Sequence, residues 1–177
     1  MPTDQMLIRA VLAGQKTAYG KLYNRYAPLV RAICYDSTQN LADAQDLAQD
    51  VFLRAYEKLD QLRRQDHFGR WLVAIARLRC KEWLRRRSRE WDRRSALVDS
   101  ELAVANPSSD GQIELLRKTI RQLPDKERLA LHVFYLQGNS AESARQIMGL
   151  SRAGFYRVLG RARERLKKFL AKEQGDI

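Results

Sequence analysis

The segment HFGRWLVAIARLRCKEWLRRRSREWDRR, residues 67–94, combines three tryptophans and a phenylalanine with closely spaced arginines. Its apolar side chains recur near helical spacing and form one side of a helix predicted over about 67–87: Phe68, Leu72, Ile75 and Ala76. The opposite side carries Arg70, Arg77 and Lys81. The pattern is imperfect, because Arg79 falls inside the apolar sector and Leu84 outside it. The segment therefore predicts a helix with one core face and one strongly basic face.

The charge of the whole chain indicates what such a basic face would bind. The 177 residues carry a net charge of +12, which is typical of a protein with a polyanionic partner. By count, the net charge is −3 over 41–60, +8 over 61–94 and +7 over 151–172. Two basic blocks predict two contacts with one polyanion, either nucleic acid or an anionic membrane. The arginines and tryptophans of residues 67–94 do not separate onto two faces, which disfavours a membrane. A merely solvated basic helix is the other alternative.

The remaining composition bounds the class of protein. Cys34 and Cys80 are the only cysteines and have no CxxC spacing, so neither a disulfide scaffold nor a zinc ribbon is predicted. No segment resembles a signal peptide or a membrane span. We therefore expect a soluble cytoplasmic protein without membrane insertion, and with neither a metal nor a cofactor.

Apolar residues recur at helical spacing through most of the chain, which predicts an all-α fold. Further helices are expected near 3–13, 16–36, 41–60, 112–122, 125–137, 140–148 and 151–172. The segment SALVDSELAVANPSSDG, residues 95–111, is acidic and ends in turn-forming residues. We interpret it as a flexible linker between two small helical domains, residues 1–94 and 112–177.

The segment MGLSRAGFYRVLGRARERL, residues 148–166, has the plan of a helix-turn-helix. Gly149 permits the tight turn, and Ser151 can cap the second helix. A core face is expected for Phe155, Leu159, Ala162 and Leu166. Outward-facing positions are then Arg152, Tyr156, Arg157, Arg161 and Arg163. Arginine at these positions suits the reading of guanine in the major groove, although an ordinary basic helical hairpin has the same pattern.

The predicted helix 41–60 has an acidic surface, because Asp43, Asp46 and Asp50 share one face. This face fits a solvated surface, a docking site for a basic protein, or a metal-dependent nuclease. The only histidines are His67 and His132, and no second acidic cluster is present, so the nuclease is the weakest of these hypotheses.

In chain order, these segments resemble the extracytoplasmic-function (ECF) sigma factors of bacterial RNA polymerase, which are members of the sigma-70 family. The segments similar to region 2 lie within about residues 7–90: YGKLYNRYAPLV, DAQDLAQDVFLRAYEKLDQL and FGRWLVAIARLRCKEWLRRR. Those similar to region 4 lie within about residues 112–170: LRKTIRQLPDKERLALHVFYLQGNS and MGLSRAGFYRVLGRARERL. The resemblance implies a non-catalytic promoter-specificity subunit whose partners are core RNA polymerase, promoter DNA and an anti-sigma factor.

The resemblance also implies three sets of site residues. The polymerase clamp would contact Asp43, Asp46, Leu47, Gln49, Asp50 and Leu53. The −10 promoter element, with its single-stranded non-template strand, would contact Leu62, Arg63, Arg64, His67, Arg70, Trp71, Arg77, Leu78, Lys81 and Arg85. The duplex −35 element would contact Ser151, Arg152, Gly154, Tyr156, Arg157 and Arg161.

Strand opening explains why residues 67–94 carry both arginines and aromatic side chains. Positive charge holds the phosphates, and aromatic or apolar surfaces receive unstacked bases. We expect Phe68 to be a core residue, and we leave Trp71 open between the core and a base contact. Several positions depart from the family pattern: Gln45 reduces the clamp-facing charge, Leu62 and Leu78 alter the base-capturing pair, and Arg145 stands where alanine is usual. Gly154 and Tyr156 replace the common threonine and lysine and predict an unusual −35 preference. A free-standing helix-turn-helix regulator that never contacts polymerase is the alternative function.

Overall fold

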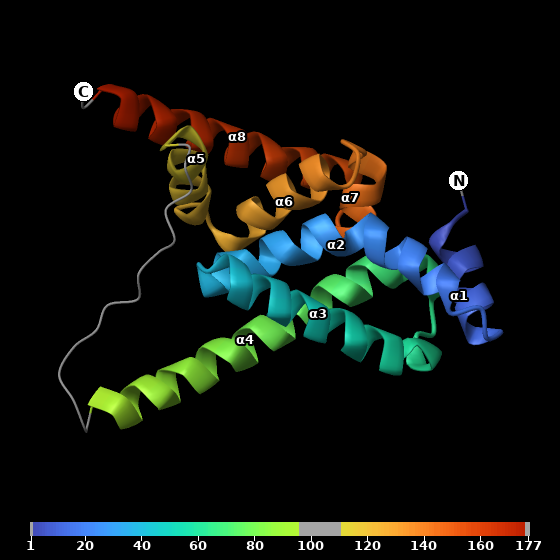
Figure 1. Cartoon of the computed structure of the whole chain (residues 1–177). Helices are drawn as coiled ribbons and strands as arrows, with labels where there is room; N and C mark the ends of the chain where they lie inside the picture. The colour runs from blue at the N-terminus through green and yellow to red at the C-terminus, as the bar shows by residue number, and fades with distance from the viewer. Residues whose placement is uncertain (1, 96–110, 176–177) are drawn as a thin grey trace. The chain divides into compact units, whose positions relative to one another are not determined.

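The computed structural model describes residues 2–95 and 111–175, which are almost entirely helical (Figure 1). The α-helices of this part are α1 (Asp4–Leu12), α2 (Thr17–Thr38), α3 (Leu41–Glu57), α4 (Phe68–Ser95), α5 (Gly111–Arg121), α6 (Asp125–Leu136), α7 (Ala141–Met148) and α8 (Arg152–Gly175). Two short 3-10 turns connect α3 to α4: η1 (Leu59–Gln61) and η2 (Gln65–His67). The predicted all-α class is confirmed, and none of the described helices is long and apolar enough to cross a membrane.

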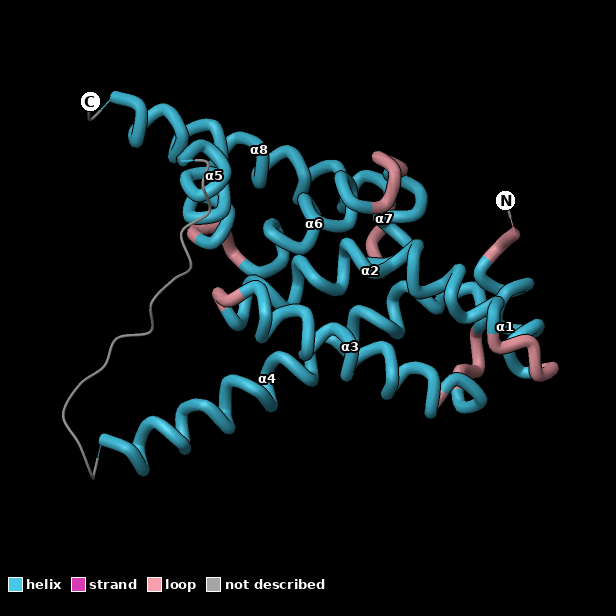
Figure 2. Tube along the Cα trace, viewed as in Figure 1, coloured by secondary structure: helices cyan, strands magenta, loops and turns pink. Residues whose placement is uncertain are grey.

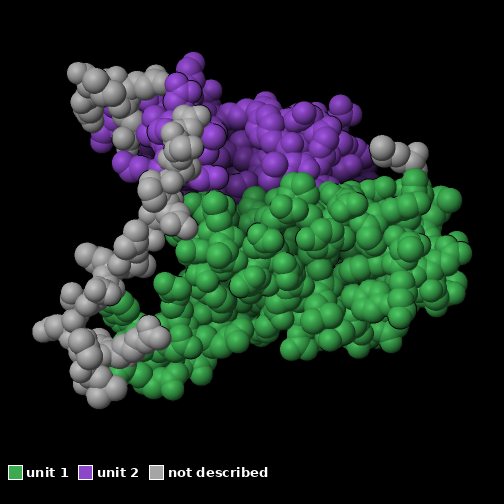
Figure 3. Space-filling model, in the orientation of Figure 1, with its two compact units in different colours: residues 1–106 green, residues 107–177 purple. Residues whose placement is uncertain are grey.

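The chain divides into two compact units, residues 1–106 and 107–177 (Figure 3). The division falls within the predicted linker, of which residues 96–110 lie outside the described part of the chain. The helix predicted over 67–87 is longer in the structure, because α4 continues to Ser95. Each unit has its own buried apolar side chains.

In the first unit, α2 is the central element, because α1, α3 and α4 all pack against it (Figure 2). Its predicted core positions are buried: Leu22, Tyr26, Leu29, Val30 and Ile33. The segment from α3 to η1 buries Leu47, Val51, Phe52, Ala55 and Leu59. The first turns of α4 bury Phe68, Leu72 and Ala76. Each fully buried leucine or phenylalanine contributes about 1.5–3 kcal/mol, so the packing of these three helices is a large stabilising contribution.

The two cysteines belong to this core. Cys34 of α2 and Cys80 of α4 are buried where the two helices pack together, and both are free thiols. The Cys80 thiol lies 3.8 Å from the carbonyl oxygen of Ile33, to which it donates. A hydrogen bond to Cys80, together with burial, raises the pKa of the Cys34 thiol. Cys34 is therefore a protonated, apolar packing residue at neutral pH.

Burial along α4 ends at Cys80, and residues 84–93 of the helix are all exposed. In Figure 1 this half of α4 continues away from α2 and α3. The helix therefore has two parts: an N-terminal half held by the core, and a C-terminal half that no other described element of the unit covers.

In the second unit, α8 packs against α5, α6 and α7. Three of the four core positions predicted for this helix are buried, namely Phe155, Leu159 and Ala162, and Val158 joins them. The fourth, Leu166, is only half-buried. The opposing helices α6 and α7 contribute Ala130, Leu131, Val133, Ala144 and Ile147.

We predict that Phe155→Ala lowers the free energy of unfolding by about 3–5 kcal/mol, because Phe155 is fully buried and its loss leaves a cavity. Urea denaturation followed by circular dichroism measures this change. The matched control is Tyr156→Ala, which removes the neighbouring aromatic ring at a 48% exposed position and is expected to cost about 1 kcal/mol or less. Equal losses for the two variants would contradict the core placement of Phe155.

Candidate functional site

The acidic face of α3 begins at a well-formed helix start. The side chain of Asn40 accepts a hydrogen bond from the backbone N–H of Asp43 at 3.1 Å, which caps the helix. Beyond the cap, Asp46, Gln49 and Leu53 are exposed, and Asp43 and Asp50 are half-buried. Leu47 was expected to contact the polymerase, but it is only 5% exposed and packs in the core. At this exposure Leu47 has almost no surface left for a partner.

Asp50 is held by α4 rather than left free. Arg79 donates from Nε to Asp50 Oδ2 at 2.5 Å, and its Nη1 also binds Glu82 of the same helix. The hydrogen bond that Arg79 donates to Asp50 is the main cause that raises the pKa of Arg79 above its usual value. This pair explains why Arg79 interrupts the apolar sector of α4: its side chain is 18% exposed, and two carboxylates compensate its charge.

A second ion pair joins the same two helices. Arg87 Nη1 lies 3.4 Å from Asp43 Oδ2, and the Arg87 guanidinium stacks over the Trp83 ring at 5.0 Å. Asp43 and Asp50 thus face arginines, whereas Asp46 has no ion pair with any residue that the structure describes. No group of three or more potential metal ligands occurs among the described residues. The exposed remainder of the face consists of Asp46, Gln49 and Leu53.

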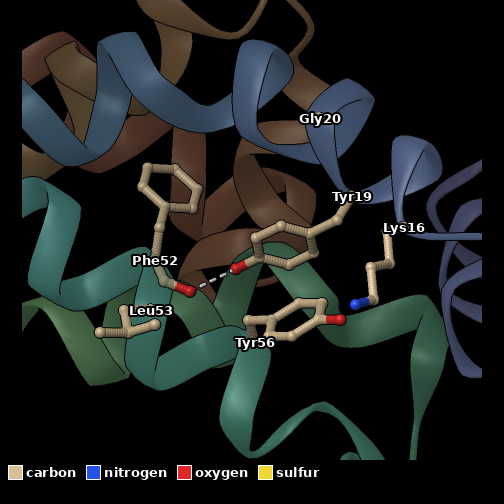
Figure 4. Close-up of a pocket in the computed structure, with 6 residues that line it drawn as sticks. All are labelled: Lys16, Tyr19, Gly20, Phe52, Leu53 and Tyr56. Carbon is tan, nitrogen blue, oxygen red and sulfur yellow. Dashed lines mark hydrogen bonds between the residues drawn. The ribbon is translucent and has the colours of Figure 1, made fainter.

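A shallow pocket lies between the start of α2 and the end of α3, next to the exposed part of the acidic face at Leu53 (Figure 4). Its volume is about 460 Å³, and it is lined by Lys16, Tyr19, Gly20, Phe52, Leu53 and Tyr56. The Tyr19 hydroxyl donates to the Phe52 carbonyl at 2.5 Å, and its ring meets Tyr56 edge-on at 4.9 Å. Burial raises the pKa of Tyr19, so the hydroxyl stays protonated and keeps this bond. Sequence reasoning singled out only Leu53 of this set, because the other residues converge from two helices.

The loop before α4 gathers the first of the predicted −10 residues. Arg64 binds Asp66 at 3.0 Å, and His67 Nε2 lies 3.5 Å from the same carboxylate. The hydrogen bond from Arg64 is the main cause that lowers the pKa of Asp66. Arg63 is exposed and Leu62 half-buried. Within the loop, Arg63 is therefore available to a partner, whereas Arg64 is paired with Asp66.

Phe68 anchors the start of α4 in the core, as expected. It is fully buried, and its ring meets that of Tyr26 at 5.4 Å. Trp71 is half-buried, with its ring 6.0 Å from that of Phe68, so part of the indole remains accessible. The remaining predicted −10 residues are all exposed: Arg70, Arg77, Leu78, Lys81 and Arg85. At 100° per residue they lie on one side of α4, and Leu78 adds an apolar surface that is 56% exposed.

In the second unit, α7, the turn and α8 have the geometry of a helix-turn-helix. Gly149 adopts a left-handed φ of 65°, and the N–H of Leu150 donates to the Arg145 carbonyl at 2.9 Å, which closes α7. Ser151 then caps α8, because its Oγ accepts from the N–H of Gly154 at 3.1 Å. The predicted turn glycine and cap are both present.

The exposed side of α8 carries Arg152, Tyr156 and Arg157 in its first two turns. Arg161 is less free than expected, because its Nε lies 3.7 Å from Glu127 Oε1 on α6, and Arg165 lies 3.4 Å from Oε2. Glu127 is 5% exposed. The sequence does not predict this burial, because acidic residues are common in the first turn of a helix such as α6. Two arginines held by one buried carboxylate fix the position of α8 against α6.

Two departures from the family pattern have a structural reason. A Cβ at Gly154 would lie 3.0 Å from Ser151 Oγ, so glycine leaves room for the cap. Ala144 is fully buried, whereas Arg145 turns outward and makes two hydrogen bonds to Glu142, at 2.5 and 2.6 Å. The small residue that the helix packing requires is therefore Ala144. Nothing in the structure explains Gln45.

Comparison with known proteins gives the family. Residues 22–90 match the sigma-70 region 2 family. The ECF RNA polymerase sigma factor SigM of Bacillus subtilis is 33% identical over 152 residues, which are 83% of this chain and 91% of SigM. The probable RNA polymerase sigma factor RfaY of Xanthomonas campestris pv. campestris is 32% identical over 167 residues, which are 89% of this chain but only 42% of RfaY.

A solved structure has a similar fold. The sigma factor RpoE of Bartonella quintana, in complex with the anti-sigma factor NepR, shares the fold with a TM-score of 0.60 and 24% identity, over 86% of this chain and 96% of that one. The chain belongs to the extracytoplasmic-function sigma factors of the sigma-70 family.

We predict that Asp50 and Arg79 are energetically coupled by about 1 kcal/mol, a value reduced by partial exposure. A double-mutant cycle with Asp50→Asn and Arg79→Gln, read by urea denaturation, measures this coupling. The matched control is the cycle of Asp43→Asn and Arg87→Gln. The charged atoms of this pair are farther apart and its side chains are more exposed, so we expect a smaller coupling energy. Similar couplings in the two cycles would refute a special role for Arg79.

Proposed function

We propose that this protein is a dissociable subunit that directs core RNA polymerase to promoters by reading a −35 and a −10 element. The observation that carries the proposal is that the two units of one chain present different binding surfaces. One unit joins an acidic face on α3 to a basic, partly apolar face on α4, and the other unit carries a helix-turn-helix with exposed arginines. It needs no catalytic group of its own, since polymerase performs the chemistry.

The polymerase contact falls on the exposed part of α3: Asp46, Gln49 and Leu53. Asp46 supplies a free negative charge, which steers a basic partner and repels DNA. Leu53, 57% exposed beside the pocket with Tyr56, supplies the apolar surface that an interface centre needs. Asp43 and Asp50 act indirectly, by holding α4 in place.

The −10 element binds across the loop of residues 62–67 and the exposed side of α4. Arg63, Arg70 and Arg77 hold phosphates of the non-template strand. The accessible edge of Trp71 stacks on an unstacked base, a contact worth about 1–3 kcal/mol, and the exposed Leu78 offers an apolar surface beside it. These gains offset the cost of unstacking, which is a few kcal/mol for each base that leaves the duplex.

The −35 element binds α8 through Arg152, Tyr156 and Arg157, which begin at the capped N-terminus of the recognition helix. Arg161 is partly engaged with Glu127, so we assign it to phosphate rather than base contact. Glycine at position 154 and tyrosine at 156 set a −35 preference of their own. By similarity to the RpoE–NepR complex, an anti-sigma factor is a further partner. A subunit of bacterial RNA polymerase works in the cytoplasm, and we assign the protein to that compartment.

We predict that purified bacterial core RNA polymerase retains the protein in a pull-down, and that Asp46→Ala raises the Kd about five- to tenfold through loss of charge steering and contact. Because Asp46 is exposed and unpaired within the described residues, the thermal unfolding of the variant should be unchanged. The matched control is Glu164→Ala, an exposed carboxylate on α8. Binding of duplex DNA without retention by polymerase would instead favour a free-standing regulator.

We predict that Arg157→Ala relaxes the −35 preference, with a loss of about 1–3 kcal/mol of discrimination if the guanidinium bridges one guanine. Transcription from a genomic-fragment library by the reconstituted holoenzyme, sequenced at its start sites, reports this preference. Lys168→Ala, which removes a charge three turns further along α8, is expected to leave the preference unchanged. An unaltered −35 motif with the Arg157 variant would remove that residue from base readout.

A further inference from the structure

Two arginines of α8 share one buried carboxylate of α6. Glu127 lies in the first turn of α6, and its side chain is only 7% exposed. Arg161 and Arg165 approach it from α8 through their Nε atoms, at 3.7 and 3.4 Å, while their own side chains are 57% and 50% exposed. The acid is therefore inside the unit, whereas both cations that pair with it reach the solvent.

The two arginines continue a row on α8 that begins with Arg157. Arg157, Arg161 and Arg165 follow one another at intervals of four residues, so each lies about 40° further around the helix and about 6 Å further along it. All three are exposed. The row spans about 12 Å, which is about the width of the major groove. A duplex that receives Arg157 in its groove therefore brings its backbone phosphates close to the later members of the row.

Glu127 reduces the positive charge of this row. One carboxylate faces two guanidinium groups, so the three side chains together carry a net charge of +1. The neighbouring Arg163 is also held by α6, because its guanidinium lies over the rings of Phe134 and Tyr135 at 5.2 and 5.6 Å. Arg157 makes no ion pair with any side chain that the structure describes. The later arginines of α8 are thus partly used within the unit, and Arg157 is not.

The packing of α6 against α8 does not require an acid at this position. The two helices pack together and bury apolar side chains on both sides, among them Val133, Phe155 and Leu159. A buried ion pair adds little stability compared with apolar side chains of similar volume, because desolvation offsets the attraction. Oε2 of Glu127 also has no hydrogen-bond partner among the described residues. What the carboxylate does change is the charge that α8 offers to an anion.

We propose that Glu127 limits the affinity of the second unit for duplex DNA, by cancelling one of the two positive charges that Arg161 and Arg165 offer to phosphates. The inference rests on the proposed function, which places α8 on duplex DNA. Phosphate contacts carry no direct sequence information, so the carboxylate weakens binding to every duplex alike. The −35 preference is left to the first turns of α8, and sequence-independent binding by the free protein stays weak.

The test is the salt dependence with which the full chain binds a mixed-sequence duplex of about 40 base pairs. Glu127→Gln keeps the shape of the side chain and removes its charge. The slope of log K against log[KCl] should become steeper by about one unit, and binding should tighten about tenfold at about 0.1 M KCl. The control Asp125→Asn removes a carboxylate of the same turn, which is 73% exposed and pairs with Arg128 of α6 itself, so its slope should match the wild type.

A triple variant shows whether the gain comes from the two arginines. Glu127→Gln/Arg161→Gln/Arg165→Gln leaves no buried acid without a partner. Its slope should be about two units shallower than that of Glu127→Gln and about one unit shallower than that of the wild type. The triple variant also decides the inference if the single variant does not fold. A triple variant equal to the wild type, or two units shallower than it, overturns the inference, as does an unchanged slope for Glu127→Gln.

A purely structural role of Glu127 gives a different result. Glu127→Gln would then weaken binding to a duplex with the −35 element, relative to the mixed-sequence duplex, and leave the slope unchanged, which contradicts the inference. We expect instead the same gain on both duplexes. A failure of the proposed function is seen separately, because the wild type would then neither be retained by polymerase nor direct transcription from the fragment library. The slopes on the mixed-sequence duplex decide the role of Glu127 in either case.

Discussion

The ion pair between Arg79 of α4 and Asp50 of α3 is the contact on which the working surface of the first unit depends. The Arg79 side chain is largely buried, so its charge needs charged partners, and Asp50 and Glu82 provide them. With Arg79 held toward α3, and Phe68 and Leu72 buried, the rotation of α4 about its axis is fixed. The arginines at other angles of the helix are then directed away from the core.

The same contact divides the charges of the unit into two groups. Arg79 and Arg87 are used internally, to join α4 to α3, and they neutralise Asp50 and Asp43 in return. Asp46 remains negative on α3, and the exposed arginines remain positive on α4. A surface for a basic protein and a surface for nucleic acid can therefore exist on neighbouring helices, because the charges that would cancel between them are already paired.

In the second unit, one buried carboxylate pairs with arginines of α8. Glu127 lies between Arg161 and Arg165, and its Oε2 has no hydrogen-bond partner among the described residues. Such a carboxylate is costly to bury, and the nearby guanidinium groups compensate it. The result is a recognition helix whose later turns are fixed to α6. Its first turns, capped by Ser151, are left free.

The sequence by itself determined the all-α class, most of the core and the helices to within a few residues, apart from the C-terminal end of α4, because these depend on local periodicity and on capping residues such as Ser151 and Gly149. It also indicated the sign of the charge on α3, which is negative, and on α4 and α8, which is positive. Only the tertiary structure decided which charged residues are available. Whether Asp43, Asp46 or Asp50 is free depends on arginines 29 to 44 residues away in the chain, and Leu47 is buried in the core. Such pairings are set by how helices pack, which no spacing within a single helix encodes.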